Sequence, residues 1–213
     1  MTCSASPRTA RSGPPGNRLD QPRRPGYVVG MEASDGRPAT GPGDLAGALH
    51  ATGPDPGLAA PLALFGRFIG AWDIEWRGTG RDGNPATMHG DLHFGWVLDG
   101  RAVQDVWRVP SSGVAPPGLR PFHGTTLRFY DPSLGAWRST WIDPLNGRVR
   151  RFIGHPEGGD IILDGLDDEP AERWAFRDIT PGPVPEFFRW TGELSTDGRR
   201  TWRLDEEMLI RRR

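Results

Sequence analysis

From Gly70 to the C-terminus, apolar and polar side chains alternate with a period of two, and this alternation restricts the fold more than any other feature. Successive side chains of a β-strand point to opposite faces, so the pattern predicts strands with one buried face. Ten segments carry it: 71–78, 88–98, 101–109, 123–130, 136–143, 147–155, 159–164, 171–178, 186–194 and 200–211. No helical pattern separates them, which argues against a parallel sheet covered by helices.

The breaks between these segments contain residues that favour tight turns. Asp99-Gly100 and Asn146-Gly147 are the strongest hairpin signals, because Asp-Gly and Asn-Gly tolerate the positive φ angles of a short hairpin turn. Ten strands joined mainly by hairpins predict an all-β fold, an antiparallel up-and-down β-barrel, whose closure removes exposed strand edges. A β-sandwich is the alternative architecture. A short helical pattern, from Leu58 to Ile69, precedes the first strand.

Large aromatic side chains are absent from the first part of the chain. All nine Trp lie between Trp72 and Trp202, whereas residues 1–60 contain no Trp or Phe and are rich in Pro and Gly. Such a segment cannot bury enough apolar surface to offset its loss of chain entropy on folding. We therefore predict a disordered tail over residues 1–55 and one barrel domain over residues 56–213. Met31 leaves a later translation start open.

Charge and cysteine content restrict the chemistry and the partners. The formal net charge is −1, so no overall field attracts nucleic acid or anionic lipid. All 26 basic residues are Arg, which excludes Schiff-base chemistry through Lys. Cys3 is the one cysteine, and no apolar run has the length of a membrane span. We expect a cytoplasmic protein that binds a small hydrophobic molecule, and not nucleic acid or a membrane. The sequence does not decide whether the protein forms a homodimer.

Four short motifs occur in the same order as in a known group of proteins. They are Gly70-Ala-Trp-Asp-Ile-Glu-Trp, Trp96-Val-Leu-Asp-Gly-Arg, Phe129-Tyr-Asp-Pro and Ser195-Thr-Asp-Gly-Arg-Arg-Thr-Trp. With these motifs, residues 65–213 resemble uncharacterised bacterial lipocalin-like (calycin) β-barrel proteins. The resemblance implies a barrel that holds a small apolar or amphipathic molecule in its lumen. Some related barrels are cofactor-free enzymes.

The opening motif is also distantly similar to that of nitrobindins, which are haem-binding barrels that begin Gly-x-Trp-x-Gly-x-Gly. The chain keeps Gly70 and Trp72 but has Ile74 and Trp76 where the later glycines belong. Nitrobindins take their iron-ligating histidine from the C-terminal part of the barrel, whereas no His follows His155 here. We therefore predict no haem and no other cofactor.

His89, Asp91 and His93 share one strand face at the spacing that some metal sites use. The opposite face of the same strand carries Leu92 and Phe94, so we expect the two histidines to point to solvent. No further cluster of metal-ligating residue types appears in the sequence, and we predict no metal site.

The apolar face of each predicted strand is assigned to the lumen. This face includes Leu127 with Phe129, and Val149 with Ile153. Nine indoles exceed what a small core normally needs, which favours an aromatic-lined cavity. The predicted ligand-binding residues are Trp96, Trp107, Phe129, Ser139, Trp141, Trp190 and His155.

Besides His155, four ionisable residues share the predicted lumenal faces: Asp105, His123, Arg151 and Glu206. Buried charge is costly unless it is paired or functional, and a dry lumen shifts pKa values towards neutrality. These four residues are therefore the candidate catalytic groups. The structural alternatives are a buried ion pair of Arg151 with Glu206 or Asp105, and a histidine, such as His155, that belongs to a loop.

Two functional hypotheses follow from these patterns. The leading one is binding of a small apolar or aromatic molecule in the barrel lumen. The alternative is a cofactor-independent enzyme of the isomerase, cyclase or lyase kind, which uses the lumenal acid and base residues on a hydrophobic substrate. A cavity of a few hundred Å³ with convergent polar groups favours either of them over a lumen filled with side chains.

Overall fold

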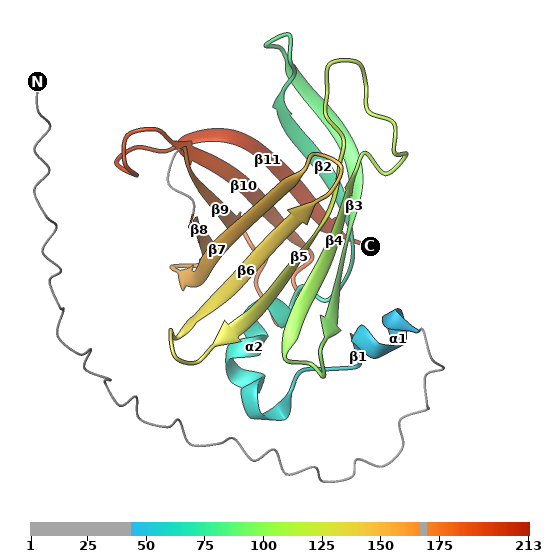
Figure 1. Cartoon of the computed structure of the whole chain (residues 1–213), viewed down its shortest axis with the longest axis vertical. Coiled ribbons are helices and arrows are strands. Elements are labelled where there is room, and N and C mark those ends of the chain that lie inside the picture. Colours follow the sequence, from blue (N-terminus) through green and yellow to red (C-terminus); the bar gives the residue numbers. More distant parts are fainter. Residues whose placement is uncertain (1–43, 167–169) are drawn as a thin grey trace, which may run out of the picture. The chain divides into compact units, whose positions relative to one another are not determined.

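The structure, a computed structural model, describes residues 44–166 and 170–213. Ten antiparallel strands form a closed barrel: each pairs with its neighbours in sequence, and β2 pairs with β11 (Figure 1). The strands are β2 (Gly70–Thr79), β3 (Pro85–Val97), β4 (Ala102–Val109), β5 (Phe122–Asp131), β6 (Ala136–Asp143), β7 (Arg148–Glu157), β8 (Asp160–Gly165), β9 (Ala171–Arg177), β10 (Phe187–Ser195) and β11 (Arg203–Arg212). The predicted all-β up-and-down barrel is confirmed, and every predicted segment forms a strand.

A short helix, α2 (Ala59–Gly66), closes one end of the barrel and lies below the strands in Figure 1. A 3-10 turn, η1 (Pro56–Leu58), precedes it, so the predicted helical segment is confirmed. Phe65 points into the barrel, where its ring centroid lies 4.8 Å from that of Trp137 and 5.6 Å from that of Phe176. Phe68 packs edge-on against Phe188 at 4.9 Å. Aromatic side chains thus fill the half of the lumen next to α2.

The segment before η1 packs against the β3–β4 turn. It contains α1 (Leu45–Leu49) and β1 (His50–Ala51), and β1 pairs with the end of β3. Gly100 has a φ of +78°, and a Cβ atom there would lie 2.2 Å from the carbonyl oxygen of Gly53. Residues 1–43 of the predicted tail lie outside the described residues, and residues 44–55 contain α1 and β1. The domain boundary at residue 55 stays a prediction.

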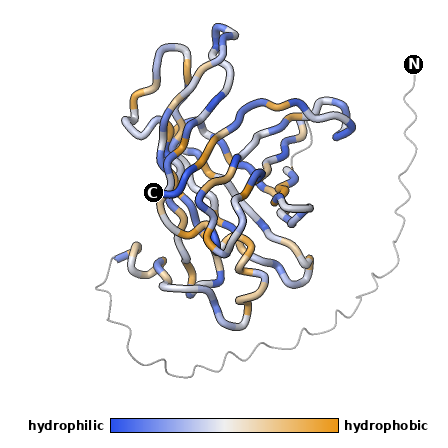
Figure 2. The backbone as a smooth tube through the Cα atoms, turned by 180° about the vertical axis from the view of Figure 1, so that it is seen from behind, coloured by the Kyte–Doolittle hydropathy of each residue, from blue (hydrophilic) through white to orange (hydrophobic). Residues whose placement is uncertain are grey.

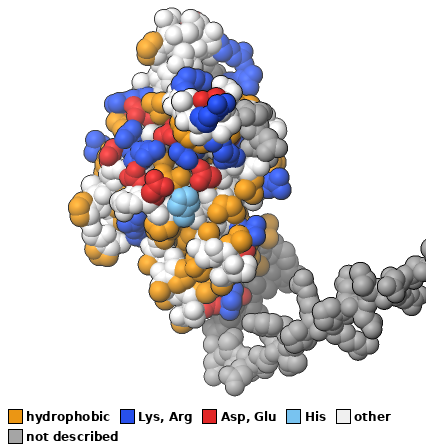
Figure 3. All heavy atoms as spheres, turned by 90° about the vertical axis from the view of Figure 1, so that its left-hand side faces the viewer, with side chains coloured by type: hydrophobic (Ala, Val, Ile, Leu, Met, Phe, Trp, Pro, Cys, Tyr) orange, Lys and Arg blue, Asp and Glu red, His pale blue; other side chains and the backbone are white. Residues whose placement is uncertain are grey.

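The hydropathy of the strands alternates along their length, as Figure 2 shows. On the face shown in Figure 3, arginines and carboxylates lie interspersed. Ion pairs also join neighbouring strands, and Arg177, for example, lies 2.8 Å from both Asp160 and Glu193. Among the described residues, no helix has the length and apolar character needed to cross a membrane.

The predicted faces are wrong for β5 and β7. Phe129 and Val149, predicted to face the lumen, are 43% and 56% exposed. Glycine and arginine take the inward positions of β5, whereas Phe152 and Gly154 take those of β7. Gly124 of β5 lies under Trp141, where a Cβ atom would come within 2.4 Å of the indole. Gly124 thus leaves room for this indole, and Phe129 and Val149 lie on the opposite, outward faces of β5 and β7.

Candidate ligand cavity

A cavity of about 460 Å³ occupies the end of the barrel opposite α2. Its mouth is formed by the β2–β3 hairpin, the β4–β5 loop, the β6–β7 turn and the start of β11. Two hydrogen bonds join these segments: the backbone N–H of Arg81 donates to the carbonyl of Gly118 at 3.2 Å, and Asn146 Nδ2 donates to the carbonyl of Pro121 at 3.0 Å. The mouth is thus held together by contacts between consecutive loops.

The indoles of Trp107, Trp141, Trp174 and Trp190 form a closed ring in the cavity, which we call the tryptophan ring. Going round the ring from Trp107, the centroid distances are 6.3, 6.0, 5.2 and 5.8 Å, and every contact is edge-to-face. Edge-to-face packing fixes the orientation of each indole, since the positive edge of one ring meets the negative face of the next. The ring presents a preformed aromatic surface.

Two indole N–H groups of the tryptophan ring have no partner. Trp107 and Trp190 are each 3% exposed, and among the described residues neither Nε1 atom has a hydrogen-bond acceptor. Trp174 differs, because its Nε1 donates to Glu172 at 2.7 Å. Buried indole N–H groups normally find acceptors, so these two carry a desolvation cost that no acceptor among the described residues offsets.

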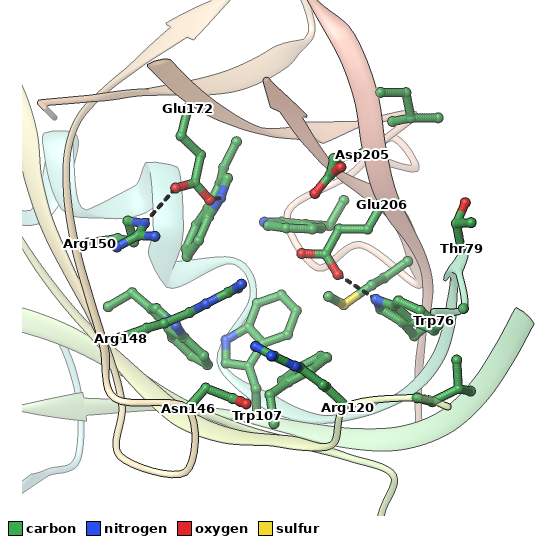
Figure 4. A pocket seen from close by; sticks show the side chains of 18 of the residues that line it. Trp76, Thr79, Trp107, Arg120, Asn146, Arg148, Arg150, Glu172, Asp205 and Glu206 are labelled. Atoms are coloured by element: carbon green, nitrogen blue, oxygen red, sulfur yellow. Dashed lines mark hydrogen bonds and ion pairs between the residues drawn. The ribbon is translucent and has the colours of Figure 1, made fainter. Parts of the chain in front are cut away.

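Two carboxylates of the cavity accept hydrogen bonds from its own walls. Glu172 accepts from Arg150 Nε at 2.8 Å as well as from Trp174, and Glu206 accepts from Trp76 Nε1 at 2.5 Å (Figure 4). Burial raises the pKa of Glu206, although the Trp76 hydrogen bond acts in the opposite direction. Glu206 is therefore the ionisable group of the cavity whose neutral form is favoured by its surroundings.

Five arginines and three carboxylates line the cavity: Arg81, Arg120, Arg148, Arg150, Arg203, Glu172, Asp205 and Glu206. Arg150 is paired with Glu172, and Arg203 lies 3.4 Å from Asp205. Within the part of the chain that the structure describes, Arg81, Arg120 and Arg148 have no carboxylate within 4.0 Å. Figure 4 shows the guanidinium groups of Arg120 and Arg148 extending from opposite sides toward the middle of the cavity, beside Trp107.

Four of the predicted site residues lie in the cavity: Trp107, Trp141, Trp190 and Glu206. Asp105 is buried as predicted, but it lies outside the cavity in an ion pair with Arg128, and it also accepts the backbone N–H of Thr126 at 2.9 Å. Of the two ion pairs considered for Arg151, the one with Asp105 is not formed, because the partner of Asp105 is Arg128 of β5. The guanidinium of Arg128 also lies over Phe65 at 4.9 Å.

The other predicted site residues lie elsewhere. Ser139 is buried outside the cavity, and Trp96 packs against α2 at Gly66. Four side chains predicted to be lumenal lie on the outer wall instead, since the alternation of β5 and β7 is reversed: His123, Phe129, Arg151 and His155. His123 borders a shallow outer groove, and His155 lies 3.6 Å from Glu157.

The prediction omitted several cavity residues. Trp76 and Trp174 lie on the buried faces of their strands, so the same alternation could have identified both. Glu172 shares a face with Trp174, two residues away, and carried the same signal. Arg120 carried no such signal, because it lies in the loop between β4 and β5, where no periodicity constrains a side chain.

The outward direction expected for His89 and His93 is confirmed, since both are exposed. Asp91, between them, is bound by Arg108 through Nε at 3.1 Å and Nη2 at 3.0 Å. Within residues 44–166 and 170–213, no three His, Cys, Asp or Glu side chains are grouped closely enough to hold a metal ion.

The fold is similar to that of two solved structures. Rv2717c from M. tuberculosis superposes with a TM-score of 0.50 at 13% identity, covering 75% of this chain and 99% of that chain. The S-type phycobiliprotein lyase CPES from Guillardia theta gives a TM-score of 0.47 at 12% identity, covering 70% of this chain and 90% of that chain. No family model matches the chain, and no curated protein matches its sequence. At such identity the likeness to Rv2717c shows the fold alone, which is a lipocalin-like barrel.

Proposed function

We propose that the protein binds a small molecule with an aromatic or apolar body in the open half of its barrel. The observation that carries this proposal is the tryptophan ring, which lines a cavity of about 460 Å³. Protein cavities that bind small molecules have volumes of roughly 300–1,000 Å³ and are lined by apolar and aromatic groups with a few polar ones. This cavity has such a volume and an aromatic wall, and it carries more charged side chains than such cavities usually do.

The arrangement of the ring favours a binding surface over simple core packing. The core next to α2 is filled by aromatic side chains from both the helix and the strands. Four indoles at the other end border an open space, and two of them keep a buried N–H without an acceptor among the described residues. A flat ligand can pack on these indoles with little rearrangement, since their mutual contacts already fix their orientation.

Titration with N-phenyl-1-naphthylamine, an uncharged aromatic probe whose fluorescence rises in apolar surroundings, tests the proposal. One saturable site per protein and quenching of tryptophan emission are expected. Trp141→Ala should weaken binding by about twofold to tenfold from the lost aromatic contact alone. Trp202→Ala is the matched control, because Trp202 lies outside the cavity lining. Absence of saturable binding, or equal effects of the two variants, contradicts the proposal.

A cofactor-independent enzyme is the second candidate, and the environment of Glu206 supports it. Among the four predicted catalytic residues, Glu206 is the one that lines the cavity, and burial raises its pKa. A raised pKa favours the protonated form of a carboxyl group, and that form can act as a general acid. In an enzyme, Glu206→Gln should abolish conversion of a metabolite from a cell extract while leaving binding of the naphthylamine probe intact. If the extract has the same metabolite profile after incubation with the wild type and with Glu206→Gln, this catalytic role is excluded.

A further inference from the structure

The hydrogen-bonding groups left unused in the cavity are donors. Indole N–H and guanidinium groups donate hydrogen bonds and cannot accept them. Trp107 Nε1 and Trp190 Nε1 have no acceptor among the described residues, and neither Arg120 nor Arg148 has a carboxylate within 4.0 Å there. The acceptors Glu172 and Glu206 are already bound by Trp174 and Trp76. A complementary molecule must therefore bring acceptor atoms.

The charged groups that line the cavity are positive on balance. Its lining holds five arginines and three carboxylates, and two of the arginines are next to carboxylates of the same lining. The third carboxylate, Glu206, has its neutral form favoured by burial. The charge that is left is positive and comes from Arg81, Arg120 and Arg148.

The unused donors lie at two depths of the cavity. Trp107 and Trp190 belong to the tryptophan ring, whereas Arg120 comes from the β4–β5 loop and Arg148 from the first residue of β7, both at the mouth. In Figure 4 the two guanidinium groups converge beside Trp107. A molecule that packs on the ring would therefore carry its charged end between the two arginines.

We propose that the ligand is an aromatic anion, whose body packs on the tryptophan ring and whose carboxylate, sulfonate or phosphate group binds Arg120 and Arg148. An uncharged hydrocarbon would cover the two guanidinium groups without offering them an acceptor, which lowers affinity. The inference rests on the proposed binding function and adds the chemical class of the ligand.

Two fluorescent probes separate the inference from the proposed function. 1-Anilinonaphthalene-8-sulfonate carries a sulfonate on the same phenyl-naphthylamine body as the uncharged N-phenyl-1-naphthylamine. The sulfonate probe should bind at least about tenfold more tightly, because hydrogen bonds to charged groups typically contribute a factor of ten or more. Its affinity should fall as salt concentration rises, while that of the uncharged probe should not. Each probe should displace the other from one site.

Three variants locate the anion. Arg120→Gln and Arg148→Gln should each weaken binding of the sulfonate probe about tenfold and leave the uncharged probe unchanged. The effects in the double variant should be less than additive if both arginines hold one group. Arg138→Gln is the matched control: it removes the same charge from the outer face of β6, where Arg138 pairs with Asp131 at 2.7 Å. Near-ultraviolet circular dichroism checks that every variant keeps the native fold.

The outcomes are distinct. Equal affinity for the two probes, or equal effects of Arg120→Gln and Arg138→Gln, overturns the inference and leaves the proposed binding function in place. If neither probe binds at a saturable site, the proposed function fails as well. Preference for the sulfonate probe that disappears only in the two cavity variants supports the aromatic anion.

Discussion

Replacing Arg128 by Met should destabilise the barrel far more than replacing both members of its ion pair. The side chains of Arg128 and Asp105 are 1% and 0% exposed. Removing the guanidinium leaves a carboxylate in the core, which typically costs about 3–5 kcal/mol. An independent estimate agrees, because neutralising an aspartate at pH 7 costs about 4 kcal/mol relative to its charged form in water. The backbone N–H of Thr126 still donates to the carboxylate and moderates the loss.

The double variant Asp105→Asn/Arg128→Met removes both charges and should lie within about 1–2 kcal/mol of the wild type. The asparagine oxygen can still accept the N–H of Thr126, and methionine fills most of the volume under Phe65. The double variant should therefore be about 2–3 kcal/mol more stable than the single variant Arg128→Met. The contact between Arg128 and the Phe65 ring is lost in both variants, so it does not contribute to the difference.

Urea unfolding followed by tryptophan fluorescence and far-ultraviolet circular dichroism measures these differences. A loss of about 4 kcal/mol shifts the midpoint by about 2 M urea at the slope usual for small proteins. If the single variant does not fold in plain buffer, the same series measured in a stabilising osmolyte such as sucrose keeps the comparison available. Equal destabilisation of the single and double variants would refute the reasoning.

Two further predictions concern the cavity. Burial raises the pKa of Glu206, so its contribution to stability is complete below the unfolded-state pKa of about 4.3 and is lost as pH rises through the folded-state pKa. Glu206→Gln should therefore gain stability relative to the wild type as pH rises, and parallel thermal denaturation profiles would contradict this. Gly124→Ala places a Cβ atom 2.4 Å from the Trp141 indole, so it should cost about 1–3 kcal/mol and weaken binding of the naphthylamine probe. Gly95→Ala, where nothing lies within 4 Å, should do neither.

The strands were predictable because their signals are local. Alternation needs only the residues of one segment, and the turns need only the tolerance of Gly, Asn and Asp for positive φ angles. Asp99 and Gly100 show this directly, with φ angles of +54° and +78° in the β3–β4 turn. Closure of the barrel also follows from the pattern, since ten hairpin-linked strands leave two edges that can pair, as β2 and β11 do.

The faces of β5 and β7 were not predictable from their own residues. Hydropathy alone places Phe129 and Val149 inside, yet an inward residue must also fit the side chains of neighbouring strands. Trp141 occupies the space beside Gly124, and Trp137 lies 3.5 Å from where a Cβ atom of Gly154 would be. Small inward residues therefore match large ones across the lumen, a relation that appears only when the register is known. The hydrogen bond between Trp76 and Glu206 likewise joins two residues that are 130 positions apart in the sequence.

The two halves of the lumen differ in how their charges are balanced, and this difference locates the candidate site more sharply than hydropathy does. In the half that α2 fills, the buried guanidinium of Arg128 is matched by Asp105 of the neighbouring strand. In the half that α2 leaves open, Arg120 and Arg148 have no carboxylate partner among the described residues, and the nearby Glu206 has its neutral form favoured. A chain can keep unbalanced positive charge at a cavity when the mouth is open to water or when an anion enters. The tryptophan ring makes the bottom of this cavity apolar and aromatic, whereas the unpaired arginines lie at its mouth. An anion with an aromatic body can therefore pack on the ring and neutralise the arginines at the same time.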